Sequence, residues 1–366
     1  MAEAECPSGC NLVAAIKRTL ESTFMRFAYW VCGLLVTGLI AAQSLRLLAD
    51  RGDAAVSEPP ASDLLGAPPA ARTIVTPALV DPVNPFDFGA KCDGVSDDSS
   101  AFQAALDAGD VRVPAGTCVI DHTVKITVSH RHMECAKGTT LRQTRPVFSM
   151  FSVVAPDGKT LTGDSIANCV FEGTNSAAPR FILDDDALHY NIPVETRDRV
   201  SDFTLVGNTF KRFFGQAMFQ TYGEVDGGSG DVIAYNRFES CGYYGAVFVA
   251  HRHGYIGHNV LIDCAVGVEN DNAQQLGGDN VIEYNDVRAI HGYGAPDMGA
   301  SVLLTGGTAG DADYSTNIVR YNTVMGVSKK AYYSFAIRPS IIWQKASGGA
   351  AQYRQNTCVR GCKVVQ

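Results

Sequence analysis

An asparagine that recurs about every two dozen residues restricts the fold of this chain more than any other feature. Each copy follows a short apolar segment, and apolar residues return two and about five positions later, as in GNTFKRF and YNRFESC. The closest copies are 28, 23 and 26 residues apart, from 208 to 236, 259 and 285. The repeat comprises Asn168, Asn208, Asn236, Asn259, Asn285, Asn322 and, more faintly, Asn356. A period of this length, built from short strands, predicts a solenoid whose stacked coils share one core.

Asparagine at one position per coil has a physical reason. The residue tolerates a left-handed backbone, and its amide can hydrogen-bond to the equivalent amide in the next coil. We therefore expect a buried ladder at one corner of the solenoid, with a structural role.

The composition of the chain excludes two classes of protein. The chain has 366 residues, 46% of them hydrophobic and 19% charged, with a formal net charge of −8. These values exclude a wholly disordered chain and a general electrostatic binder of nucleic acid, so no nucleic-acid partner is expected. The 36 glycines indicate many tight turns.

The N-terminal part is predicted to direct the chain to a membrane. Residues 27–42 carry no charge, and three basic residues precede them, which favours a cytoplasmic segment over 1–25 and a membrane anchor over 26–48. Translation from Met25 would instead give a cleaved signal peptide. In both cases the part of the chain that follows this segment is exported, and it is either anchored at the membrane or secreted. Residues 49–83 are rich in Ala, Pro and Ser and are expected to form a disordered linker before a folded domain over 84–366.

The start of that domain resembles a known family. The segment NPFDFGAKCDGVSDDSSAFQAAL followed by VRVPAGTCVI, at 84–106 and 111–120, is similar to the N-terminal signature of pectate-lyase-superfamily proteins, which include polygalacturonase-like and rhamnogalacturonase-like enzymes and phage tailspikes. The resemblance implies an all-β, single-stranded, right-handed parallel β-helix with an N-terminal capping helix. It also implies that Asp97 and Asp98 are helix caps rather than catalytic acids.

Cysteines suggest further structure. Cys92 and Cys118 replace residues that are usual in the family pattern, so we predict that they pair, and Cys358 with Cys362 can close the last coil. Cys241 and Cys264 each follow a repeat asparagine by five residues and are expected to stack in the core as small apolar side chains. No paired CxxC spacing supports a zinc site.

Candidate chemistry lies on one outer face of the coils. The segments AMFQTY, AVFVAH, GVENDN, ASVLLTG and YSFAIRP look like one strand repeated along the solenoid, with polar residues at their distal ends. A base or acid from Tyr or His, charge neutralisation by Arg and an orienting carboxylate would suit lyase or epimerase chemistry on an acidic sugar. The candidate catalytic residues are Tyr222, His251, His253, Asp271 and Arg338, and the candidate substrate-binding residues are Gln220, Arg252 and Glu269.

The sequence allows several alternative functions and sites. A hydrolase needs two carboxylates, for which Asp271 with Glu269 or with Asp297 are candidates. Residues 184–186 with His189 lie in an insertion that reads as a polar loop tip. We expect an exported enzyme that cleaves or modifies a polysaccharide as lyase or glycoside hydrolase, with no cofactor or a bridging Ca²⁺ and no other metal. The alternatives are a C5-epimerase of a polyuronate and a non-catalytic β-helix that binds glycan or protein. The membrane segment disfavours a tailspike-like trimer, and the oligomeric state is left open.

Overall fold

The computed structural model describes residues 74–175, 191–215, 219–221, 228–240, 245–264, 266–271, 278–290, 300–305, 316–327, 340–345, 352–360 and 363–365. The chain divides into two units, Met1–Arg72 and Thr73–Gln366. The predicted cytoplasmic segment, membrane segment and most of the predicted linker lie outside the described residues. Within the described part, no helix is long and apolar enough to cross a membrane.

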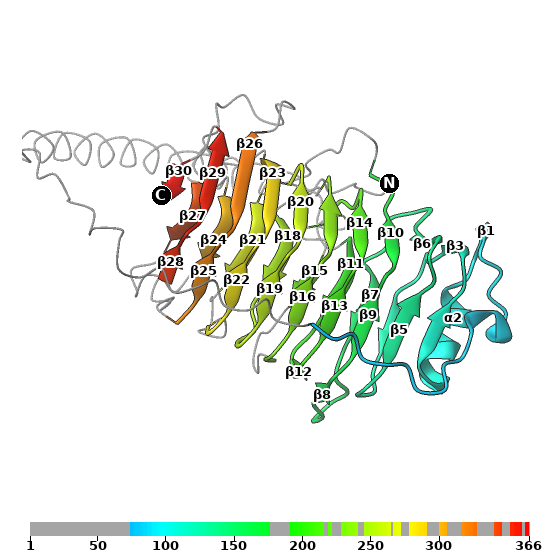
Figure 1. Ribbon diagram of the computed structural model, residues 1–366. Coiled ribbons are helices and arrows are strands. Elements are labelled where there is room, and N and C mark those ends of the chain that lie inside the picture. Colours follow the sequence, from blue (N-terminus) through cyan, green and yellow to red (C-terminus); the bar gives the residue numbers. More distant parts are fainter. Residues whose placement is uncertain are drawn as a thin grey trace, which may run out of the picture. The chain divides into compact units, whose positions relative to one another are not determined.

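Three long parallel sheets run side by side along the second unit (Figure 1). We call them sheets A, B and C, because the chain visits them repeatedly in that order. Sheet A contains β2 (Val111–Val113), β5 (His132–Cys135), β9 (Ser165–Ala167), β13 (Thr204–Val206), β16 (Val232–Ala234), β19 (Tyr255–Gly257), β22 (Val281–Glu283), β25 (Ile318–Arg320) and β28 (Gln352–Arg354).

Sheet B contains β1 (Asp93–Asp97), β3 (Gly116–Val119), β6 (Thr139–Arg142), β10 (Val170–Glu172), β14 (Thr209–Lys211), β17 (Arg237–Glu239), β20 (Val260–Ile262), β23 (Asp286–Ile290), β26 (Thr323–Val327) and β29 (Thr357–Arg360). Sheet C contains β4 (Val124–Ile126), β7 (Ser149–Val153), β11 (Ile192–Thr196), β15 (Phe219–Thr221), β18 (Gly245–Val249), β21 (Val266–Asp271), β24 (Ala300–Thr305), β27 (Ser340–Lys345) and β30 (Lys363–Val365). This architecture confirms the solenoid that the repeat predicted and the parallel β-helix that the resemblance implied.

Short elements complete the fold. The 3-10 helix η1 (Pro85–Phe88) precedes β1, and α2 (Ser99–Ala108) lies at the N-terminal end of the coils, where Phe102 packs edge-on against Phe151 of sheet C (Figure 1). A two-stranded pair, β8 (Leu161–Thr162) with β12 (Val200–Ser201), lies between sheets C and A. Asp98 begins α2, but its carboxylate accepts backbone hydrogen bonds from Lys91, Cys92 and Val119, so it joins neighbouring segments rather than capping the helix.

The asparagine ladder runs along the corner between sheets A and B. Each buried amide donates to the side-chain oxygen of the next, with Nδ2 to Oδ1 distances of 2.9–3.2 Å along the series Asn208, Asn236, Asn259, Asn285, Asn322 and Asn356. Each Oδ1 also accepts the backbone N–H of the preceding ladder residue. Buried polar groups at the corner are thereby satisfied, as predicted.

Two details of the predicted ladder are wrong. Asn168 is exposed and lies one residue before the ladder position, which Cys169 occupies by donating its backbone N–H to Asn208 Oδ1. The left-handed residue is the one before each ladder asparagine, such as Tyr235 with φ 56°, and not the asparagine itself.

Inside the coils, aromatic rings of sheet B stack on one another. The centroids of Phe171 and Phe210 are 4.7 Å apart, and those of Phe210 and Phe238 are 5.0 Å apart. All three side chains are fully buried. Because strands repeat every coil, identical side chains stack in one column through this part of the core.

Disulfides join neighbouring coils. Cys92–Cys118 forms as predicted, and Cys135–Cys169 forms in addition. Cys264 is buried in the core, as expected, and is also disulfide-bonded. Cys241 and Cys362 lie outside the described residues.

Candidate functional site

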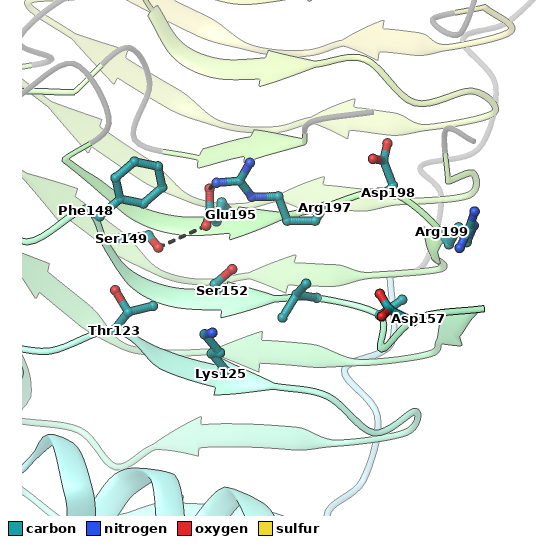
Figure 2. Close-up of a pocket in the computed structure, with 12 residues that line it drawn as sticks. Thr123, Lys125, Phe148, Ser149, Ser152, Asp157, Glu195, Arg197, Asp198 and Arg199 are labelled. Atoms are coloured by element: carbon teal, nitrogen blue, oxygen red, sulfur yellow. Dashed lines mark hydrogen bonds and ion pairs between the residues drawn. The ribbon is translucent and has the colours of Figure 1, made fainter. Parts of the chain in front are cut away.

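The outer face of sheet C carries a pocket of about 570 Å³ over its first three strands (Figure 2). Lys125, Ser152 and Glu195 occupy one register column of β4, β7 and β11, and strand alternation turns that column away from the core. The remaining walls come from the residues just before and after these strands. The pocket is lined by Thr123, Lys125, Phe148, Ser149, Ser152, Val154, Ala155, Asp157, Glu195, Arg197, Asp198 and Arg199.

Glu195 is the most enclosed charged residue of the pocket, with 3% of its surface exposed. Ser149 donates its hydroxyl to Oε1 at 3.0 Å, and an Arg197 nitrogen lies 3.1 Å from Oε2. The two contacts hold the carboxylate in one orientation against the pocket floor. Figure 2 shows the Ser149 hydroxyl directed at Glu195, with the guanidinium of Arg197 beside the Glu195 carboxylate.

The pocket combines an aromatic ring with groups of both charges. Phe148 is 46% exposed, and the Arg197 guanidinium lies 5.6 Å from its ring centroid. Asp157 and Asp198 add two further carboxylates, and Lys125 and Arg199 add two cations. Such a lining offers both hydrogen bonds and an apolar surface to a polar ligand.

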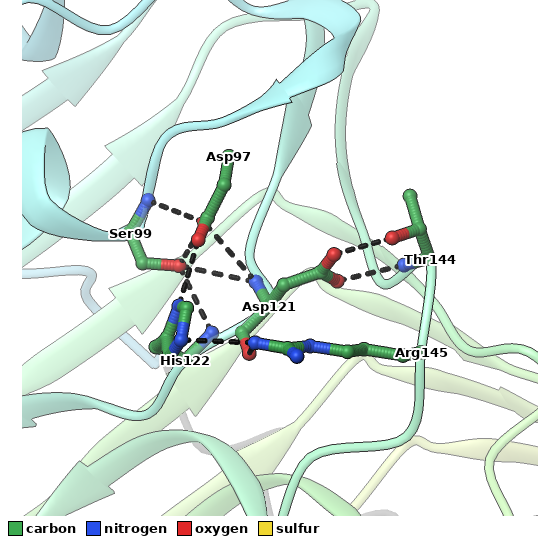
Figure 3. A network of polar contacts seen from close by, with 6 residues as sticks. All are labelled: Asp97, Ser99, Asp121, His122, Thr144 and Arg145. Atoms are coloured by element: carbon green, nitrogen blue, oxygen red, sulfur yellow. Dashed lines mark hydrogen bonds and ion pairs between the residues drawn. The ribbon is translucent and has the colours of Figure 1, made fainter.

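A polar network binds the first coils together at the neighbouring corner (Figure 3). His122 Nδ1 lies 2.7 Å from Asp97 Oδ2, and His122 Nε2 lies 2.9 Å from an Arg145 nitrogen. Burial raises the pKa of Asp97, but hydrogen bonds from Ser99 and His122 outweigh that effect and leave it below the usual value. His122 immediately precedes Thr123 in the pocket lining, so the network supports the pocket's edge.

The residues that the sequence grouped into one site are described only in part. Strands β15, β18, β21 and β24 do lie side by side in sheet C, as the repeated segments indicated. The fifth segment was placed wrongly, because β24 pairs with β27 (Ser340–Lys345) rather than with YSFAIRP. Tyr222, Asp297 and Arg338, like 184–186 and His189, lie outside the described residues.

His251 lies inside the β-helix rather than on its outer face. Phe219 pairs with Val247, so the residues of β15 and β18 are offset by one from the expected alignment, and His251 falls on the inward side. Its side chain is fully buried, and Nδ1 lies 2.6 Å from Asp231 Oδ2.

The other candidates lie near different elements. Gln220 is the central residue of β15, and Asp271 ends β21. Glu269 is buried in β21, at the column position of Phe248. Arg252 and His253 are exposed after β18 and lie 2.9 Å and 3.7 Å from the same Asp279 oxygen. Gln220 is the register partner of Glu195, so the column that forms the pocket continues into β15, and Phe248 and Glu269 follow in the same column.

Sequence reasoning missed the pocket because it assigned the segment that contains Glu195 to an insertion. The sequence does carry a signal for a strand here. The segment IPVET begins with alternating apolar and non-aliphatic residues, as the neighbouring strands of sheet C do.

One described cluster has three metal-ligand atoms close together, namely Cys92, Asp98 and Cys118. Its two sulfurs form a disulfide, and Asp98 accepts three backbone N–H groups, so these residues do not fit a metal ion. The Ca²⁺ expectation therefore gains no site from this cluster.

Comparison with solved structures supports the fold. A tailspike mutant of E. coli bacteriophage HK620, solved in complex with a pentasaccharide, superposes with a TM-score of 0.52 at 14% identity over 76% of this chain. The chain spans 57% of that tailspike. The tailspike of Acinetobacter baumannii phage AM24 gives a TM-score of 0.49 at 14% identity, covering 78% of this chain and 54% of its own.

The Streptococcus pneumoniae surface adhesin PfbA gives a TM-score of 0.44 at 14% identity, covering 72% of this chain and 77% of its own. No protein-family model matches the chain, and no curated protein matches it in sequence. The chain is thus a parallel β-helix protein with the architecture seen in a phage tailspike.

Proposed function

We propose that this protein binds a polysaccharide in the pocket on the outer face of sheet C. The observation that carries the proposal is the oriented Glu195 carboxylate, held by Ser149 and Arg197 beside the exposed ring of Phe148. Carboxylates and guanidinium groups hydrogen-bond to sugar hydroxyls, and an aromatic ring contacts the apolar face of a sugar. The pentasaccharide complex of the HK620 tailspike supports this ligand class for the fold.

Cleavage of the glycan is the second function that we propose. Glycoside hydrolysis needs two carboxyl groups, and Asp157 and Asp198 lie in the same pocket as Glu195. Lyase or epimerase chemistry through Tyr222, His251 and Arg338 loses support because His251 is buried. In this proposal Gln220, Arg252 and Glu269 contact the substrate, His253 and Asp271 are further candidate catalytic residues, and Ca²⁺ bridges an acidic glycan to the protein.

Export belongs to the same proposal. Cys92–Cys118 and Cys135–Cys169 suit an oxidising compartment, where disulfides persist. The predicted membrane anchor or signal segment would deliver the β-helix to such a compartment.

The test measures binding and cleavage by the purified full chain on a panel of neutral and acidic polysaccharides, with and without Ca²⁺. Glu195→Gln is compared with Glu239→Gln, a matched change on the outer face of sheet B. We expect at least tenfold weaker binding, or loss of new reducing ends, for Glu195→Gln alone. Absorbance at 235 nm distinguishes a lyase from a hydrolase. If both variants equal the wild type on every bound polymer, the pocket is not the binding site.

A further inference from the structure

A column of aromatic rings lies on the outside of the corner between sheets A and B. The rings of Tyr235, His258, Tyr284 and Tyr321 stack with centroid distances of 4.8, 4.9 and 4.8 Å and interplanar angles of 6–9°. Each residue immediately precedes a ladder asparagine and has a left-handed backbone, with φ of 55–57°. The shared backbone conformation aims all four rings in one direction.

The stack ends at Tyr235 because the next position in the column is a glycine. Gly207 donates its backbone N–H to Ala234 of the following coil, as Tyr235 does to Gly257, so the two residues are equivalent. Tyr235 is 49% exposed, whereas the other three rings are only partly exposed. One face of the Tyr235 ring therefore borders a missing ring rather than a neighbour.

A polar side chain from an earlier coil borders Gly207. The amide oxygen of Asn168 lies 2.5 Å from the point that a Cβ on Gly207 would occupy, so a larger side chain at 207 would collide with it. Asn168 donates to Glu134 at 3.3 Å, and Glu134 pairs with Arg112 at 3.3 Å. Hydrogen-bonding groups thus lie on the far side of Gly207 from the Tyr235 ring.

We propose that the free face of Tyr235 is a second carbohydrate-binding site, which takes one neutral pyranose ring in the position of the missing aromatic ring. The axial C–H groups of a pyranose carry partial positive charge and pack on the electron-rich face of tyrosine. The Asn168 amide oxygen accepts a hydrogen bond from a sugar hydroxyl. The net charge of −8 and the paired Arg112 and Glu134 favour a neutral ring over an anionic one.

This site is separate from the Glu195 pocket, which lies on sheet C, and it does not depend on cleavage. It goes beyond the proposed function by giving the chain two glycan contacts on different faces. A glycan that reaches both sites, or two chains of the same glycan, then binds with higher avidity than a glycan held at one site alone.

The test uses cellohexaose, a neutral oligosaccharide, with the full chain and saturation-transfer NMR to detect binding. We expect Tyr235→Ala to weaken the affinity at least tenfold and Tyr235→Phe, which keeps the ring, to stay within twofold of the wild type. Asn168→Gly should weaken binding by a smaller factor, about threefold. Phe86→Ala is the matched control, since Phe86 is also exposed, at 40%, but has no place in the stack.

Two results would overturn the site. One is the absence of any cellohexaose signal, and the other is an unchanged affinity in folded Tyr235→Ala. A loss confined to Glu195→Gln would leave the proposed function standing and reject the Tyr235 site. Thermal unfolding of each variant verifies that the stack itself has not collapsed.

Discussion

His251 Nδ1 lies 2.6 Å from Asp231 Oδ2, and neither side chain has any exposed surface. Asp231 Oδ1 also accepts the backbone N–H of Phe203, so the pair joins two coils in the interior. A buried carboxylate that loses its partner destabilises the folded state strongly.

His251→Ala should therefore lower the free energy of unfolding by about 3 kcal/mol. Polysaccharide binding at a temperature where the variant stays folded should not change, because His251 is remote from solvent. His253→Ala is the control, since that side chain is exposed and should leave the urea midpoint almost unchanged. A selective loss of binding by folded His251→Ala would restore a functional role to this histidine.

The asparagine ladder gives a second prediction. The Asn259 side chain makes four hydrogen bonds, to the backbone and side chain of Asn236, to Ile233 and to Asn285. Asn259→Ala leaves these buried groups without partners and should cost about 3 kcal/mol in unfolding free energy. Asn168→Gly, which removes an exposed amide, should cost less than about 1 kcal/mol in the same urea titration. Equal costs would show that the ladder adds nothing to stability.

The Cys135–Cys169 disulfide closes a loop with a sequence separation of 34 residues. Replacing both cysteines with serine frees the unfolded chain and should cost about 4 kcal/mol by the loop-entropy model. The urea midpoint of the double variant, measured without reductant, tests this expectation. Mass spectrometry of the alkylated wild type establishes that the disulfide is present, and an unchanged midpoint would contradict the prediction.

Asp164 gives a pH-dependent prediction. Burial raises the pKa of this carboxyl to about 6, despite hydrogen bonding from Arg131 and nearby positive charge. Because the folded-state pKa lies above the unfolded value of 3.8, the favourable contribution is complete below pH 3.8 and is lost as pH rises through about 6. The loss amounts to roughly 3 kcal/mol.

Asp164→Asn should therefore stabilise the chain at pH 7.5 and flatten its stability between pH 4 and 7. Asparagine already occupies the equivalent position in later coils, at Asn280 and Asn317, where its oxygen accepts the same kind of backbone hydrogen bond. Asp107→Asn, an exposed control, should leave the pH profile unaltered. Urea midpoints across this pH range would refute the idea if both variants follow the wild type.

The coil architecture could be predicted because its signal is periodic and local. Each ladder asparagine satisfies the same backbone groups, so Asn236, Asn259 and Asn285 recur with recognisable flanking residues. The Cys92–Cys118 disulfide could be predicted for a different reason, because both cysteines depart from the family signature. Cys135–Cys169 was not, because Cys169 stands where an asparagine stands in later coils.

The candidate site could not be predicted because it depends on register and turn length. A shift of one residue turns His251 from the outer face to the core, and sequence segments alone do not define that register. The pocket combines Thr123, Phe148 and Arg197 from three coils of unequal length. No local pattern links residues so far apart in the chain.

The ladder also bears on how such a chain can change length. From Asn208 onward, each coil presents the same asparagine and the same parallel strand edges to the coils on either side. In-frame duplication or excision of one whole coil, about 23 to 28 codons in the regular part, therefore preserves the ladder and the strand pairing between neighbours. The number of coils can therefore change by duplication or loss of a repeat in the gene. The area of the outer surface changes with that number, while the cross-section of the β-helix stays constant.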